Sequence, residues 1–185
     1  IIYPVVMFGV AQVAFHKQAN GSQVSYNGHV VGSSLLCQEF VDAKGNPLPQ
    51  YFQPRPSAAS SSTSKTDYGC NPLFSGATNL GPNNPKLIAA IKARQQQIAA
   101  FDHVKISQIP PDAVTSSASG LDPYISPQNA AIQLNRVATA RHASPAAIMA
   151  LVNQYTQGRT LGFLGEPRVN VLNLNIALNQ KFPAP

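Results

Sequence analysis

Residues 1–15 are uncharged and mostly apolar, and the chain then becomes polar over residues 16–22. Fifteen residues of α-helix rise ~22 Å, whereas the hydrocarbon core of a bilayer is ~30 Å thick. Because the chain starts with Ile and not with Met, we interpret residues 1–17 as the outer part of a membrane-spanning helix whose first turns are missing. The alternative is a secretory signal core of ~7–15 apolar residues, with a cleavage site at residues 19–21.

Gln12 interrupts this apolar segment. An amide side chain that faces lipid has no hydrogen-bond partner, which is costly. We therefore predict that Gln12 faces a helix of another membrane protein, where the amide can form an interhelical hydrogen bond. The alternative is that the side chain reaches the lipid headgroups.

Three helices are predicted by the same start signal, an N-cap side chain followed directly by proline. The three starts are Asn84-Pro85, Ser126-Pro127 and Ser144-Pro145. Apolar residues with helical spacing follow each start and are expected to face the core. They are Leu87, Ile88, Ile91, Ile98 and Phe101 in the first helix, Ala130, Leu134, Val137 and Ala138 in the second, and Ile148, Leu151, Val152 and Tyr155 in the third, which should end near Gly158.

Strand signals are fewer. Asn27-Gly28 predicts a type I′ hairpin between residues 23–26 and 29–40, with Val30 and Val31 at least half-buried. Residues 44–47 read as a turn, and residues 112–119 as a further strand. Residues 168–179 show both periods, which favours a strand that runs into a helix. The Ser/Thr-rich residues 60–66 are interpreted as a variable loop.

These elements predict an α+β fold. Residues 1–17 form the truncated transmembrane helix, and residues 18–185 form a single α/β domain with a small sheet and about three to four helices. The remaining length is sufficient for one hydrophobic core.

Composition narrows the function classes. The net charge is +6, but the basic residues are scattered and form no patch interleaved with aromatic residues. This distribution argues against a nucleic-acid partner and is consistent with attraction of the domain to anionic lipid. Cys37 and Cys70 match neither a metal site nor a disulfide framework. A single disulfide is expected only if the domain is exported, and two separate buried thiols are the alternative.

The usual catalytic motifs are missing. The sequence has no GxxxxGK[ST] phosphate loop, GxGxxG, HExxH or GxSxG motif. The four histidines lie in unrelated contexts, and the two glutamates, Glu39 and Glu166, are far apart in the chain. A binding or assembly role is therefore favoured over an enzyme.

Short motifs in a fixed order carry a family resemblance. They are Tyr3-Pro4, residues 18–22 (QANGS), Gly32-Ser33, Gln38, Phe40, Tyr51-Phe52, residues 55–58 (RPSA), Asn71-Pro72, Ser75-Gly76, Asn79-Leu80, Asn84-Pro85, residues 117–122 (SASGLD), Ile125, Pro127, residues 136–138 (RVA), Ala140-Arg141, Gly165, Pro167, residues 169–171 (VNV), Leu174-Asn175 and Ala177-Leu178. In these motifs the chain resembles the KdpC family, the small accessory component of the Kdp potassium-transporting P-type ATPase. Cys70 departs from the family, which often has Tyr at that position.

The resemblance implies an accessory, non-ion-conducting subunit of a high-affinity ATP-driven potassium uptake complex. It implies a single-pass protein of the bacterial cytoplasmic (inner) membrane, with residues 18–185 outside the cytoplasm. The implied partners are a potassium-channel-like subunit, an ATP-hydrolysing pump subunit, a small membrane peptide and membrane lipid. The chain lacks a DKTGT-type phosphorylation motif and a TVGYG-type filter, which agrees with a non-catalytic subunit that stabilises assembly.

The candidate contact residues follow from this interpretation. Gln12 is expected to contact the channel-like subunit, and the loops with Tyr51, Phe52 and Arg55 and with Glu166 and Arg168 are expected to contact partner proteins. The alternative for Arg55 and Arg168 is that they brace loops of their own domain.

Nucleotide contact is the weaker expectation. The family is described as a catalytic chaperone that raises the ATP affinity of the pump subunit, although ATP is cytosolic. The nearest match to a nucleotide contact is Ser119-Gly120 with Gln128. For these residues we favour an ordinary role at a helix start over a nucleotide contact. We expect no metal site and no tightly bound cofactor, and ATP to act only through the complex. The alternative function is a membrane-tethered extracytoplasmic binding module for a small solute, which an apolar pocket with convergent polar groups would favour.

Overall fold

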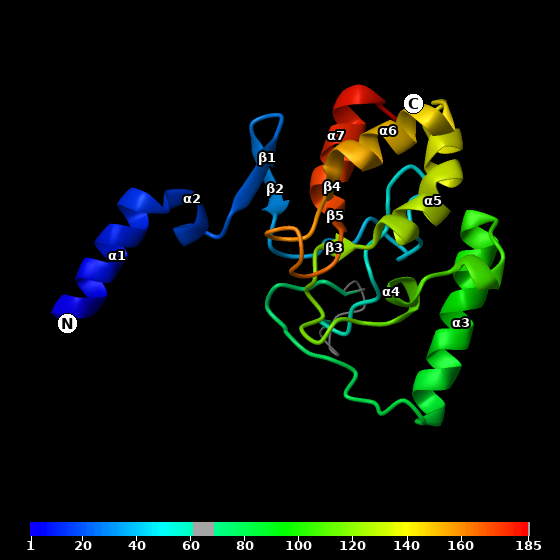
Figure 1. The fold of residues 1–185 in the computed structure, drawn as a ribbon, viewed down its shortest axis with the longest axis horizontal. Coiled ribbons are helices and arrows are strands. Elements are labelled where there is room, and N and C mark those ends of the chain that lie inside the picture. Colours follow the sequence, from blue (N-terminus) through cyan, green and yellow to red (C-terminus); the bar gives the residue numbers. More distant parts are fainter. Residues whose placement is uncertain (61–68, 185) are drawn as a thin grey trace.

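The computed structural model describes residues 1–60 and 69–184 and shows helices gathered around a small sheet (Figure 1). The helices are α1 (Ile2–Ala14), α2 (His16–Ala19), α3 (Pro85–Asp102), the 3-10 helix η1 (Ile106–Gln108), α4 (Pro111–Val114), α5 (Pro127–Ala140), α6 (Pro145–Tyr155) and α7 (Val171–Lys181). The strands are β1 (Gln23–Tyr26), β2 (His29–Ser33), β3 (Tyr124–Ile125), β4 (Thr156–Gln157) and β5 (Arg168–Asn170). The predicted mixture of helices with small sheets is confirmed.

The N-terminal helix α1 stands apart from the rest of the molecule, and α2 continues it after a break at Phe15 (Figure 1). No side chain of α1 is buried. Across residues 1–60 and 69–184, none of the helices is both long enough and apolar enough to cross a membrane.

The first sheet is the predicted hairpin. Asn27 and Gly28 both have positive φ, 51° and 80°, as a type I′ turn requires. The second strand is shorter than expected, because β2 ends at Ser33. Val30 is 60% exposed, so the expectation that it is at least half-buried is wrong. The physical reason is that β1 and β2 form an isolated two-stranded sheet that contributes no residue to the core.

The second sheet holds three short antiparallel strands in the order β3-β5-β4. Its central strand β5 leads directly into α7, which confirms the predicted strand-to-helix transition at the C-terminus. The strand predicted within residues 112–119 is wrong, because the short helix α4 (Pro111–Val114) covers the start of this segment and residues 115–119 form no strand. Proline at the first position and Asp112 in the first turn both favour a helix start.

The three predicted helix starts are confirmed in detail. The side chains of Asn84, Ser126 and Ser144 accept hydrogen bonds from backbone N–H groups in the first turns of α3, α5 and α6. The last of these helices ends at Tyr155, earlier than expected near Gly158, because the next two residues form β4.

The core lies where α5, α6 and α7 pack around β5. It consists of Phe52, Ile125, Ala130, Leu134, Val137, Ala138, Ile148, Leu151, Val152, Val169, Val171, Leu174, Ala177 and Leu178. The predicted apolar stripes of α5 and α6 belong to it. The stripe of α3 does not: Asp102 is the only buried residue of that helix, and Ile88 is 41% exposed. Helix α3 runs along one edge of the molecule (Figure 1), and the other stripe residues, Leu87, Ile91, Ile98 and Phe101, are only partly buried.

Cys37 and Cys70 form a disulfide, with Cα atoms 5.3 Å apart. Both residues are buried, with exposures of 8% and 6%. The sequence left pairing and separate thiols open, and the structure selects pairing. Residues 61–66 of the predicted variable loop lie outside the described part of the chain.

Candidate functional site

Three of the residues predicted to contact a partner line one cavity. Arg55, Glu166 and Arg168 come from distant parts of the sequence and meet around a cavity of about 480 Å³, which we call the arginine groove. Its other lining residues are Pro111, Asp112, Asp122, Tyr124, Ile125, Ser126 and Pro167. The groove lies beside β3, at the start of α4 and α5, and at the segment that leads into β5.

Arg55 is held by its own domain. Its Nη1 forms an ion pair of 2.9 Å with Asp122 Oδ2, and the two side chains are 22% and 28% exposed. The other oxygen of this carboxylate accepts a 3.0 Å hydrogen bond from the backbone N–H of Tyr124. Arg55 therefore braces the entry to β3, the alternative role considered for it, while it also lines the groove.

Arg168 and Glu166 are more accessible. The Arg168 guanidinium lies 4.8 Å from the centre of the Tyr124 ring, and its Nε donates a 3.3 Å hydrogen bond to Gln157. Glu166 pairs with Arg159 at 2.8 Å, but the two side chains are 79% and 45% exposed. Because such exposed ion pairs contribute little stability, Glu166 can exchange this partner for another one.

Tyr51 and Phe52 are oriented inward. Phe52 is fully buried, and its backbone N–H and C=O each form a 2.9 Å hydrogen bond with the side-chain amide of Asn175 on α7. Tyr51 stacks between the Phe40 ring and the Arg141 guanidinium, at 5.1 and 4.8 Å. Phe52 is therefore a core residue and not a surface contact. No pattern in the sequence indicated this pairing with Asn175, because 123 residues separate the two.

Gln12 takes part in a polar cluster of its own chain. Its Oε1 accepts a 3.1 Å hydrogen bond from Asn20 Nδ2 and lies 3.2 Å from His16 Nδ1. The cluster lies at the junction of α1 and α2. A hydrogen bond from Gln12 to another protein would therefore compete with, or extend, this local arrangement.

The backbone at Ser119-Gly120 does not form an open cradle, and Gln128 is an exposed residue in the first turn of α5. Ser119 is exposed, whereas Gly120 is buried. The Gly120 carbonyl accepts a 2.6 Å hydrogen bond from Ser57 Oγ, and Ser119 O accepts one from the Gly76 N–H. A Cβ at Gly120 would lie 2.7 Å from Gly76 O and 2.8 Å from Ala59 N. The chain itself therefore fills the space beside this glycine.

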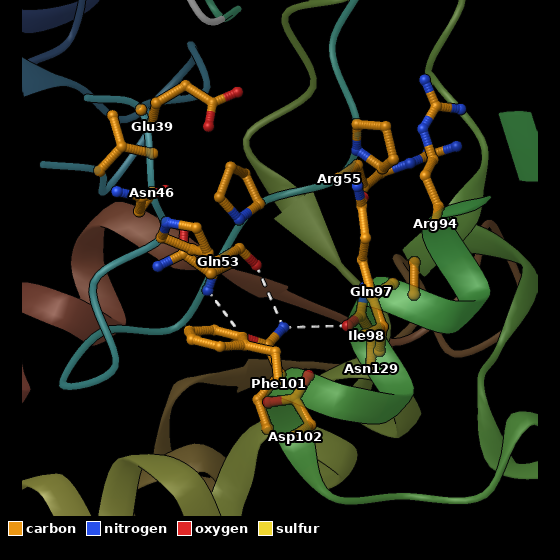
Figure 2. Close-up of a pocket in the computed structure, with 17 residues that line it drawn as sticks. Glu39, Asn46, Gln53, Arg55, Arg94, Gln97, Ile98, Phe101, Asp102 and Asn129 are labelled. Carbon is orange, nitrogen blue, oxygen red and sulfur yellow. Dashed lines mark hydrogen bonds between the residues drawn. The ribbon is translucent and has the colours of Figure 1, made fainter.

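A second cavity of about 570 Å³, which the sequence did not predict, lies between residues 39–56 and helix α3 (Figure 2). We call it the proline pocket, because Pro47, Pro54 and Pro56 line it. Glu39 is one of its polar residues, and burial raises the pKa of that carboxyl to about 7. A lone glutamate in a mostly uncharged segment was the only sequence signal. Within residues 1–60 and 69–184, no three histidine, cysteine or acidic side chains converge as metal ligands.

Comparison with protein families gives a match over nearly the whole chain. The family described as "KdpC: K+-transporting ATPase, c chain" matches residues 1–180. The match includes the N-terminal helix, the proline pocket and the arginine groove.

Individual relatives agree with this match. A protein from Dechloromonas aromatica (strain RCB) is 48% identical over 179 residues, which cover 97% of this chain and 87% of the relative. One from Kineococcus radiotolerans is 45% identical over 183 residues, 99% of this chain and 86% of the relative. One from Paraburkholderia phytofirmans is 49% identical over 180 residues, 97% of this chain and 88% of the relative. Each is named a potassium-transporting ATPase KdpC subunit.

Proposed function

The chain belongs to the KdpC family of potassium-transporting ATPase subunits, and from this membership we propose that it is the accessory, non-conducting and non-hydrolysing subunit of an ATP-driven potassium uptake complex. The observation that carries the proposal is the family match across residues 1–180. Its partners in this proposal are the potassium-channel-like subunit, the ATP-hydrolysing subunit and the small membrane peptide of the complex.

The location in this proposal is the cytoplasmic membrane, with α1 as the outer part of a single anchor and the folded domain outside the cytoplasm. Two features support it. Helix α1 is uncharged and stands apart from the domain with no buried residue (Figure 1). This is expected of a helix whose apolar surface is covered by lipid or by other helices. The Cys37–Cys70 disulfide suits an oxidising compartment, because cytosolic thiols are kept reduced.

The arginine groove is the proposed contact with a partner subunit. Glu166 is 79% exposed, and Arg168 lines the same groove with one face of its guanidinium against Tyr124. Arginine and aromatic side chains that converge in a concave site are enriched at the centres of protein interfaces. The role of Arg55 in the proposed contact is mainly structural, because its ion pair with Asp122 stabilises the wall of the groove.

ATP is proposed to reach this subunit only indirectly. The space beside Gly120 is filled by Gly76 and Ala59, so a nucleotide cannot approach that backbone without a rearrangement. Any rise in the ATP affinity of the pump subunit then comes from assembly and not from a nucleotide pocket in this domain. Calorimetric titration of the full chain with ATP should give no binding in the low micromolar range, and a low micromolar dissociation constant would refute this part.

Co-purification tests the partner contact. The full chain carrying Arg168→Met is co-expressed with its partner subunits in membranes. It should recover less of the channel-like and pump subunits than wild type does, because we expect the substitution to cost about 1–3 kcal/mol of binding free energy. Lys181→Met is the matched control, because Lys181 is an exposed cation near the C-terminus that contacts Gln154. Equal recovery in both variants would remove the groove from the interface, and failure of the wild-type chain to recover either subunit would refute the function itself.

A further inference from the structure

The proline pocket has the size and the walls of a small-molecule site. Its volume of about 570 Å³ lies within the ~300–1,000 Å³ typical of ligand pockets. The apolar wall is formed by Val41, Pro47, Pro54, Pro56, Ile98, Phe101 and Ala113. Prolines lose little conformational entropy when a ligand orders them, so this wall is largely preformed.

Two arginines are anchored at neighbouring points of the pocket. Arg94 Nη1 donates a 3.0 Å hydrogen bond to Val114 O, and Arg55 Nη2 lies 3.4 Å from Thr115 O. Consecutive Cα atoms are ~3.8 Å apart, so these two carbonyls hold both guanidinium groups in one region. Figure 2 shows Arg55 and Arg94 toward the same side of the pocket, with Glu39 toward the other.

The charge of this pair is only partly compensated. Arg55 is paired with Asp122, whereas Arg94 has no carboxylate partner among residues 1–60 and 69–184. Burial lowers the pKa of Arg94, which reflects the cost of holding its charge away from water. Arg55 Nε is buried without a hydrogen-bond partner in the described chain. Since a guanidinium carries five N–H donors, both groups keep donors for an anion.

Most of the other polar groups of the pocket are already engaged. Asp102 binds Arg136 Nε at 2.7 Å, and the Gln53 amide donates to the carbonyls of Phe40 and Leu48 at 3.0 and 3.1 Å. Two polar side chains remain, the exposed and neutral Gln97 and the carboxyl of Glu39. Burial raises the pKa of Glu39 to about 7. Below that pH the carboxyl is mostly protonated, so it repels an anion less than a carboxylate would.

We propose that the proline pocket binds a small organic anion, with its carboxylate on Arg94 and Arg55 and its apolar part against Ile98, Phe101 and the prolines. Guanidinium groups match a carboxylate in shape and form the stronger, charge-assisted hydrogen bonds. The anion supplies the countercharge that Arg94 lacks within the described chain. This pocket shares Arg55 with the arginine groove, whereas Arg94 lines the pocket alone.

The test uses the full chain in lipid nanodiscs and 2-naphthoate as the probe, with binding measured by isothermal titration calorimetry. The neutral analogue 2-naphthamide has the same rings without the charge. Wild type should bind the naphthoate at least about tenfold more tightly than the amide, because the charged hydrogen bonds dominate. Empty nanodiscs correct for partition of both compounds into lipid.

Variants locate the site. Arg94→Met should weaken naphthoate binding at least about tenfold, with little change for the amide, because the charge is lost and the apolar stem is kept. Arg94→Lys keeps the charge without the planar guanidinium, so its affinity for naphthoate should lie between those of wild type and Arg94→Met. Lys92→Met is the control, since Lys92 is exposed on the same helix and does not line the pocket; its affinity should stay within about twofold of wild type.

The proposal is overturned if wild type binds both probes equally, or if Arg94→Met and Lys92→Met bind naphthoate equally. If Arg94→Met does not fold, the proposal is still tested by the Arg94→Lys variant and by the comparison of the two probes on wild type. A naphthoate-dependent shift of the Ile98 methyl signals in the NMR spectrum is the second expected readout, and no shift there would place the ligand elsewhere.

Discussion

At the scale of single residues, the described structure separates side chains that serve the fold from those that remain available for binding. Phe52 and Tyr51 were expected at a surface, yet Phe52 is fully buried and Tyr51 is stacked between Phe40 and Arg141. Arg168 and Glu166 keep accessible groups in the arginine groove. The sequence predicted all four as partner contacts, with bracing of its own domain as the alternative for Arg168. It could not separate core from interface, because aromatic and arginine side chains occur in both.

Glu39 should make stability fall as pH rises. Its pKa is about 7 in the folded chain, compared with an ordinary value of 4.5, so the folded state binds more protons between these values. The free energy of unfolding therefore decreases from about pH 4.5 through about pH 7, by up to about 3 kcal/mol at ~1.4 kcal/mol per pKa unit. Urea unfolding across this range should show the decrease.

Glu39→Gln should abolish most of that decrease, because the amide does not ionise. Glu166→Gln is the control, as Glu166 is 79% exposed, and its pH profile should follow wild type. A Glu39→Gln profile that is parallel to wild type would show that the carboxyl is not responsible.

Gly120→Ala should destabilise the domain. Gly120 has a φ of 71°, and a Cβ there would meet Gly76 O and Ala59 N at 2.7 and 2.8 Å. We expect a loss of about 1–3 kcal/mol from backbone strain and displaced neighbours. Gly81→Ala is the control, because nothing in the described chain lies within 4 Å of its Cβ position; equal unfolding midpoints for both variants would contradict this interpretation.

At the scale of elements, proline-started helices were predicted with the best accuracy. The caps at Asn84, Ser126 and Ser144 depend on bonds within one turn, so the local sequence specifies them. The Ser126 cap is linked to another helix, because Ser126 Oγ also donates to Asp112 Oδ1 at 2.8 Å. Sequence could not indicate this link between α4 and α5.

Ser126→Ala should therefore cost more than an ordinary cap. We expect a loss of about 1–3 kcal/mol, because the N-terminus of α5 and a carboxylate oxygen of Asp112 lose a partner together. Ser144→Ala removes a hydroxyl that accepts a hydrogen bond from the Ala147 N–H of its own helix, and it should cost about 1 kcal/mol. Chemical denaturation measures both, and equal losses would mean that the contact with Asp112 adds nothing.

The disulfide between the segment after β2 and the segment before α3 should stabilise the domain by about 3–4 kcal/mol, because it restricts the unfolded chain across the observed 33-residue separation. The double variant Cys37→Ala with Cys70→Ala should unfold at lower denaturant than the oxidised wild type. Reducing agent should lower the midpoint of wild type and leave the variant unchanged. Free thiols titrated in the oxidised, unfolded wild type would show that the bond does not form.

At the scale of the whole molecule, the exposed helix α1 is the proposed anchor, and the folded domain is the proposed contact with partner subunits (Figure 1). Anchoring confines the domain near its partners, at effective concentrations that are often millimolar. Deletion of residues 1–19 should therefore reduce assembly of the complex more than Arg168→Met does, as measured by recovery of partner subunits from membranes. A larger effect of the point variant would contradict the anchoring role.

Protease added to spheroplasts tests the proposed sidedness. The domain should be digested without permeabilising the membrane, and a cytoplasmic control protein should survive. Digestion that requires detergent would place the domain on the other side.

The sequence by itself determined the features that depend on short-range physics or on motif order. These are the helix starts, the Asn27-Gly28 turn, the passage from strand to helix at residues 168–179, and the family. Only the tertiary structure decided the pairing of Cys37 with Cys70, the burial of Phe52 against Asn175, the position of α3 outside the core, and the convergence of Arg55 with Arg94. Such features depend on contacts between residues tens of positions apart, and local periodicity carries no information about which distant segments meet.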